Sequence, residues 1–88
     1  MRKLSLSNDA QKFIDKLAPK QFKQVVSKVM DLTQDAVPSD SEKLKGFDGR
    51  RTDMGEFRIV YHFDADTVYV DNIGKRNDDE VYKQLRNK

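Results

Sequence analysis

The sequence contains no cysteine and a single histidine, His62. The lack of cysteine excludes disulfides, a thiol nucleophile and a sulfur-ligated metal, and one histidine leaves little with which to build a zinc or iron site. No stretch approaches the roughly 20 apolar residues of a membrane span, and residues 1–3 are not followed by the apolar core of a signal peptide. We therefore expect a cytoplasmic protein that uses no metal or cofactor and has no membrane partner.

The chain has 88 residues, which is enough for one domain, 1–88, with one layer of helices on one sheet. Its net charge is +2, but the basic residues are unevenly placed. Segments 43–58 and 74–88 each hold five Lys or Arg against three Asp or Glu. If these segments meet in space, one face is basic, as expected of a protein that binds a polyanion; the alternative is an ordinary solvated surface.

The first third of the chain predicts a short strand followed by two helices. Leu4 and Leu6 alternate with polar neighbours over residues 2–6, as they would in a strand. Residues 7–9 offer N-cap side chains for a helix of about three turns, and Pro19 suits the first turn of a second helix. We expect these helices to form a hairpin whose apolar face turns inward. The apolar positions at helical spacing are Ala10, Phe13, Ile14 and Leu17, then Phe22, Val25, Val26, Val29 and Met30.

The middle of the chain predicts strands. Helical periodicity disappears from 33 to 46, which indicates a surface loop. Residues 56–63 then alternate between apolar and polar side chains, with the period of a strand that has one face on a core. Residues 64–66 suit a compact turn, and the β-branched and aromatic residues of 67–73 suit the returning strand.

A capping box, Asn77 with Glu80, predicts a last helix from about Asp78 to Asn87. The predicted fold class is therefore α+β, a helical hairpin packed on a small, mainly antiparallel sheet with a C-terminal helix. Its element order is β-α-α-β-β-β-α.

Three side chains stand out for their chemistry. Alternation along the strand turns Arg58 away from the aromatic face, and Arg76 follows Gly74 just past the end of the returning strand. In an antiparallel hairpin both arginines can reach the same end of the sheet, and the next helix brings Tyr82 back towards it. Such a group would suit a phosphodiester, because a guanidinium grips phosphate with a planar fork of donors.

Arg58 and Tyr82 also have ordinary structural explanations. Arg58 could form a surface ion pair with Asp71 or Glu56, and Tyr82 could be a half-buried aromatic of the last helix. His62 shares a face with Arg58 but lies four residues along, a spacing of about 13 Å. One phosphate cannot be reached from both positions unless the side chains converge, so we favour a structural or edge role for His62.

Three sequence elements follow one another in a recognisable order. They are Lys43-Leu44-Lys45-Gly46, then Met54-Gly55-Glu56-Phe57-Arg58-Ile59-Val60-Tyr61, and then Ile73-Gly74-Lys75-Arg76. Together with the two preceding helices they resemble the RelE/ParE superfamily of toxins over nearly the whole chain. Members of the RelE branch cleave messenger RNA on the ribosome, whereas ParE members poison DNA gyrase. The ending Gly74-Lys75-Arg76, followed by Val81-Tyr82, is similar to the RelE branch.

The resemblance implies a toxin of a type II toxin–antitoxin system that cleaves mRNA in the ribosomal A site and so inhibits translation. It assigns charge stabilisation to Arg58, leaving-group stabilisation or protonation to Arg76, and a role as base, stacking or orienting group to Tyr82. RelE-like nucleases carry lysines on the strand where this chain has Arg50 and Arg51, and arginine holds phosphate well but is a poor general base. The residues expected to bind the RNA backbone are Lys43, Lys45, Arg50, Arg51 and Lys75.

The resemblance also implies two partners. One is a cognate antitoxin whose acidic or amphipathic segment covers the basic face, and the other is a ribosome that carries mRNA. The sequence shows no DNA-reading helix pair, so we expect no direct DNA binding without the antitoxin. Two other functions stay open: a non-enzymatic gyrase inhibitor of the ParE kind, and a toxin-fold binding module without activity.

Overall fold

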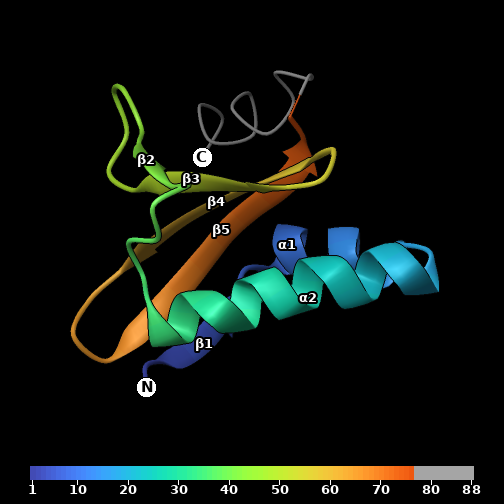
Figure 1. Cartoon of the computed structure of the whole chain (residues 1–88), viewed down its shortest axis with the longest axis horizontal. Helices are drawn as coiled ribbons and strands as arrows, with labels where there is room; N and C mark the ends of the chain where they lie inside the picture. Colours follow the sequence, from blue (N-terminus) through green and yellow to red (C-terminus); the bar gives the residue numbers. More distant parts are fainter. Residues whose placement is uncertain (77–88) are drawn as a thin grey trace.

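The computed structural model describes residues 1–76, in which two helices pack on one face of a five-stranded sheet (Figure 1). The α+β fold with a mainly antiparallel sheet is confirmed. The predicted last helix, 78–87, lies outside the described residues. The elements are β1 Lys3–Leu6, α1 Asn8–Asp15, α2 Pro19–Gln34, β2 Glu42–Lys43, β3 Arg50–Met54, β4 Phe57–Phe63 and β5 Thr67–Lys75.

The strands are arranged in the order β1-β5-β4-β3-β2. β1 pairs with β5 in parallel, and the other neighbours pair antiparallel. Met54 lies opposite Phe57, so β3 and β4 are joined by a two-residue turn, Gly55 and Glu56. Gly55 has a φ of 60°, which suits the first central position of a type II′ turn, where glycine is preferred. This turn fixes which residues of β3 and β4 face each other.

Both helix starts agree with their sequence signals. Ser7 is the N-cap of α1, and its Oγ accepts a hydrogen bond from the backbone N–H of Ala10 at 3.1 Å. The same hydroxyl donates to the backbone oxygen of Asp71 at 2.7 Å, which ties the start of α1 to β5. Pro19 is the first residue of α2. Neither helix is long and apolar enough to cross a membrane within the part of the chain that the structure describes.

The inward face of α2 differs from the predicted stripe. Val25, Val29 and Leu32 are buried against the sheet, but Phe22 and Met30 are 41% and 46% exposed. Met30 follows a buried residue directly and so lies about 100° around the helix from it. The expectation that the whole apolar stripe turns inward is therefore wrong at these two positions.

The segment 33–46, expected to be a loop, contains regular structure at both ends. α2 continues to Gln34, and residues 42–43 form the short strand β2 against Arg50 and Arg51 of β3. A strand of two residues is too short to show a period of two in the sequence, so no alternation marks it. The structure therefore has one more strand after the helices than predicted.

Tyr61 anchors β4 to the segment that follows α2. Its ring is fully buried, and its hydroxyl donates to the backbone oxygen of Ala36 at 2.7 Å. Burial raises the pKa of Tyr61, because the charged phenolate is disfavoured away from water. The neutral form of the side chain is therefore the one that supports the fold.

Tyr61→Phe is expected to lower the free energy of unfolding by about 1–2 kcal/mol, because the oxygen of Ala36 loses its donor. Since the folded-state pKa of Tyr61 is raised, its contribution is fully present below about pH 10 and is lost as the pH rises further. Urea unfolding at about pH 7 and about pH 11 measures both effects. A stability difference that stays the same at the two pH values would contradict the role of the phenol.

Candidate nucleic-acid interface

The register of β3 against β4 divides the predicted RNA-binding residues between two faces of the sheet. Tyr61 packs in the core beneath the helices, and Arg50 lies opposite it. Cross-strand partners share a face and successive residues alternate, so Arg51, opposite Val60, points the other way. We call the face turned away from the helices the distal face. It carries Arg51, Asp53, Arg58, His62 and Tyr69.

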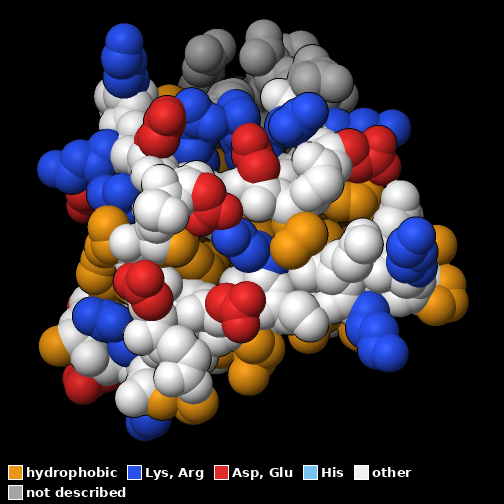
Figure 2. Space-filling view, in the orientation of Figure 1, with side chains coloured by type: hydrophobic (Ala, Val, Ile, Leu, Met, Phe, Trp, Pro, Cys, Tyr) orange, Lys and Arg blue, Asp and Glu red, His pale blue; other side chains and the backbone are white. Residues whose placement is uncertain are grey.

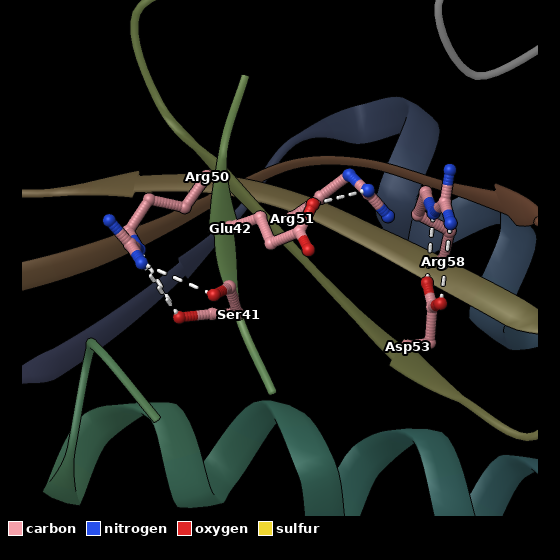
Figure 3. Close-up of polar contacts among 6 residues, drawn as sticks. All are labelled: Ser41, Glu42, Arg50, Arg51, Asp53 and Arg58. Atoms are coloured by element: carbon pink, nitrogen blue, oxygen red, sulfur yellow. Dashed lines mark hydrogen bonds and ion pairs between the residues drawn. The ribbon is translucent and has the colours of Figure 1, made fainter. Parts of the chain in front are cut away.

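Arg58 lies on the distal face, and the carboxylate of its cross-strand partner Asp53 holds its guanidinium (Figure 3). Nε donates to Oδ1 at 2.8 Å, and Nη2 donates to Oδ2 at 3.3 Å, in a two-pronged ion pair. The Arg58 side chain is 17% exposed. Asp53 is a partner not predicted from the sequence, and Asp71, one of the two predicted, pairs with His62. The contact with Asp53 fixes the fork of donors close to the surface.

The β4–β5 ladder brings Arg58 and Arg76 to the same end of the sheet. Arg58 lies opposite Gly74, and the backbone N–H of Arg76 donates to the oxygen of Glu56 at 2.9 Å, one step beyond the ladder. Arg76 is therefore the diagonal neighbour of Arg58, a relation that corresponds to roughly 7–8 Å between Cα atoms. Arg76 is exposed. Tyr82, the third residue of the predicted site, lies outside the described residues.

Arg50 is held on the helix side of the sheet (Figure 3). Its Nε and Nη2 donate to Ser41 Oγ at 3.2 and 3.1 Å, and Nη2 also approaches the Ser41 backbone oxygen at 3.4 Å. Lys43, opposite Arg50, and Lys75, opposite a core residue of β4, share this side. The structure thus does not bring these three predicted RNA-binding residues onto the distal face with Arg51.

The predicted RNA-binding residues not yet described are Arg51 and Lys45, and Arg51 has an acidic partner. Arg51 Nη2 contacts Glu42 Oε2 at 2.6 Å, with side chains that are 28% and 68% exposed. Lys45 is exposed in the loop between β2 and β3. Figure 2 shows basic and acidic groups intermixed over the part of the molecule where these strands lie. An RNA phosphate would therefore compete with carboxylates for the arginines.

His62 lies on the distal face, as strand alternation predicts, but it has its own partner. Its Nδ1 is 2.7 Å from Asp71 Oδ2, and the two side chains are 47% and 29% exposed. Among residues 1–76, no group of three or more histidine or acidic side chains is placed to hold a metal ion. The chemistry that this face offers is phosphate binding by arginine, together with an imidazole held by a carboxylate.

The different surroundings of Arg50 and Arg51 predict that substitution of each residue by alanine lowers the stability of the fold by a different amount. Arg50→Ala is expected to cost about 1–2 kcal/mol of stability, because Ser41 loses a partly buried donor. Arg51→Ala is expected to cost less than about 1 kcal/mol, since its ion pair is at the surface. If Arg51 binds an RNA phosphate, its removal also lowers the salt dependence of RNA affinity by about one unit of slope. Thermal unfolding and salt-dependent RNA titration separate the two cases.

The sequence from residue 4 to residue 80 matches the family described as the ParE toxin of the type II toxin–antitoxin system parDE. The chain belongs to this family of toxins. This ParE-family chain is thus a type II toxin of the RelE/ParE superfamily, as the sequence elements predicted. A search of the curated proteins gives no match.

Solved structures similar to this ParE-family chain include RelE toxins. An Escherichia coli RelE mutant in the free state, with two arginines replaced by alanine, aligns with a TM-score of 0.79 at 23% identity, over 98% of this chain and 95% of that one. The RelBE2 toxin–antitoxin complex from Mycobacterium tuberculosis gives 0.75 at 20% identity, over 85% and 98%. The RelE–RelB complex from Pyrococcus horikoshii OT3 gives 0.73 at 18% identity, over 85% and 94%. At these identities the likeness establishes the shared fold.

Proposed function

We propose that this toxin is a ribosome-dependent endoribonuclease that cleaves mRNA in the A site. The observation that carries the proposal is the position of Arg58 and Arg76, which the β4–β5 ladder places as diagonal neighbours at one end of the sheet. Two guanidinium groups at this separation suit one phosphodiester, because each can donate two hydrogen bonds to its oxygens. The RelE-like ending of the sequence, with Tyr82 on the segment that follows, supports the same assignment.

The proposed reaction uses the RNA's own 2′-hydroxyl. Its oxygen loses a proton and attacks the adjacent phosphorus, the bond from phosphorus to the 5′-oxygen breaks, and that oxygen takes up a proton. Arg58 neutralises the charge that develops on the phosphorane, and Arg76 stabilises the negative charge on the departing 5′-oxygen, which takes its proton from water. Tyr82 is assigned the role of base or of orienting the nucleotide, and as a base it would need nearby cations that favour its ionised form. Arginine supplies no base here, since it stays protonated at accessible pH.

A cognate antitoxin is the second partner in this proposal. Two of the similar structures, from Mycobacterium tuberculosis and Pyrococcus horikoshii, are toxin–antitoxin complexes. For this chain we propose an antitoxin whose acidic or amphipathic segment covers Arg58 and Arg76. Such a segment would present carboxylates to the same guanidinium groups that bind phosphate, and so would compete directly with RNA.

A second candidate function is inhibition of DNA gyrase without RNA cleavage. The observation that favours it is the matching family itself, whose description names the ParE toxin of parDE. In this case Arg58 and Arg76 would be surface residues of a protein interface. A toxin-fold module without either activity is the third possibility.

One experiment separates the three. The purified chain is incubated with ribosomes programmed with a defined message, and the RNA ends are mapped by primer extension. The nuclease predicts cuts at the codon in the A site, and none in the same message without ribosomes. Gyrase supercoiling is measured in parallel. Inhibited supercoiling with intact message would replace the proposal by the second candidate, and no effect in either assay would leave the third.

A further inference from the structure

Two aromatic rings of the distal face form a stack at the end of β4 away from Arg58. The rings of His62 and Tyr69 have centroids 4.7 Å apart and planes inclined by 11°. The two residues are cross-strand partners only because a bulge between Val60 and Tyr61 shifts the β4–β5 register. Without that shift His62 would lie opposite Val70. Bulges that re-aim side chains are common next to functional sites.

A carboxylate holds each ring of this stack. Asp71 accepts from Nδ1 of His62 at 2.7 Å, and Asp64 accepts from the hydroxyl of Tyr69 at 3.0 Å. An ionised carboxylate can only accept, so Nδ1 carries a proton and Nε2 is directed elsewhere. Hydrogen bonds from the backbone N–H groups of Asp66 and Thr67, and then from Tyr69, lower the pKa of Asp64 and keep it in the accepting form. The rings are thus fixed before any ligand binds.

His62 also lines a cavity of about 210 Å³ at this end of the sheet. This volume is below the roughly 300–1,000 Å³ of pockets that enclose a drug-sized ligand, so the cavity suits one flat ring. Lys43 reaches this cavity from the helix side of the sheet, whereas His62 lines it from the distal face. Lys43 supplies a cation for a neighbouring phosphate, and Asp48 supplies an acceptor for ring N–H groups. The lining residues are Lys43, Asp48, Gly49, Arg50, His62 and Phe63.

The His62–Tyr69 stack lies on the same face of the sheet as Arg58, further along β4. Arg58 and His62 share the distal face at a separation of about 13 Å along β4. Arg51, which lies opposite Val60, is between them on the neighbouring strand. A single RNA strand that follows β4 would meet a phosphate ligand at Arg58, a second cation at Arg51 and an aromatic ring at His62. His62 is thus too far away to act on the phosphate at Arg58, but it is placed for a nearby nucleotide.

We propose that the cavity beside the His62–Tyr69 stack binds one nucleobase of single-stranded RNA, which stacks on the His62 ring at a position next to the cleaved nucleotide. Histidine and other flat side chains are common stacking partners of unpaired bases. The stack would set the register of the message on the toxin. The proposal rests on RNA being the ligand of the proposed function, but it does not require that the chain cleave RNA.

The test uses short single-stranded RNA whose riboses are 2′-O-methylated, so that it cannot be cleaved through the 2′-hydroxyl. The affinity of the whole chain is measured by fluorescence anisotropy at low salt, with a series of probes that each lack one base. The His62→Ala chain is expected to bind the full probe about tenfold more weakly, the size of one lost stacking contact. At one abasic position the wild-type chain loses a similar factor and the His62→Ala chain loses nothing further.

Two control variants test whether the loss of RNA affinity is specific to the flat ring of His62. His62→Phe retains a flat ring without the Asp71 bond and is expected to stay within about threefold of wild type. Met30→Ala removes an exposed apolar side chain from α2, on the helix side, and is expected to change nothing. Thermal unfolding verifies that each variant is folded.

Three outcomes would overturn the proposal: equal affinity of wild type and His62→Ala, no abasic position that matters to wild type, or no binding of the probe by wild type. A different outcome would overturn the proposed nuclease function alone. If programmed ribosomes yield intact message while His62→Ala still weakens RNA binding at one base position, the stacking site stands and the cleavage assignment falls.

Discussion

The Arg58→Ala chain is expected to cleave mRNA on programmed ribosomes about a hundred to a thousand times more slowly than the wild-type chain. Removal of one preorganised donor from a developing negative charge typically has this effect on kcat. The fold should survive with a loss of about 1–3 kcal/mol, because the charge-assisted hydrogen bonds between Arg58 and Asp53 are only partly buried. The measurement is single-turnover cleavage with saturating toxin, together with thermal unfolding of the same preparation.

Asp53→Asn is the matched control for this prediction. The amide keeps the shape of the side chain and can still accept a hydrogen bond from Arg58, but it no longer neutralises the guanidinium. RNA phosphate then competes with a weaker partner, so the KM should fall while kcat stays within a few-fold. An equal loss of cleavage in Asp53→Asn and Arg58→Ala would mean that the ion pair itself, and not the guanidinium on phosphate, supports activity. Arg58→Ala at wild-type rate would remove Arg58 from the mechanism.

Much of the fold could be predicted because each signal was local. Ser7 and Pro19 mark helix starts through capping chemistry that depends on a few neighbouring residues. The alternation of residues 56–63 predicted β4 and correctly placed Arg58 and His62 on one face. Apolar spacing alone could not tell which α2 side chains the sheet would reach, so it predicts Phe22 and Met30 in the core although they are exposed.

To predict the site, one must know which residues of neighbouring strands pair and which face each side chain is on. The sequence contained part of this information. Consecutive residues of a strand point to opposite faces, so Arg50 and Arg51 could not both have clamped one RNA backbone. A two-residue turn at Gly55 would likewise have placed Asp53 opposite Arg58. The contact of His62 with Tyr69 depends on the bulge that Asp71 of β5 makes opposite Val60 and Tyr61, and no local pattern in the sequence marks it.

Gly49→Ala is expected to lower the free energy of unfolding by about 2–4 kcal/mol, which for a domain of this size corresponds to a fall in Tm of about 10–25 °C. Gly49 has a φ of +142°, and a Cβ built there would lie 2.7 Å from the backbone oxygen of Tyr61. That oxygen belongs to β4 in the middle of the sheet and cannot retreat without disturbing the core. Thermal unfolding followed by circular dichroism measures the loss.

Gly46→Ala, three residues earlier in the same loop, separates the two causes of the loss at Gly49, which are the strained backbone conformation and the contact with the backbone of Tyr61. Gly46 has a φ of +76°, but a Cβ there would meet no atom within 4 Å, so only the left-handed backbone cost of about 1–2 kcal/mol applies. Similar losses at both glycines would contradict the close approach to Tyr61 as the main cause of the loss at Gly49. A clearly larger loss at Gly49 would mean that backbone contact with β4 holds this loop in place. Because Gly49 directly precedes β3, the same contact fixes the register that places Arg51 on the distal face.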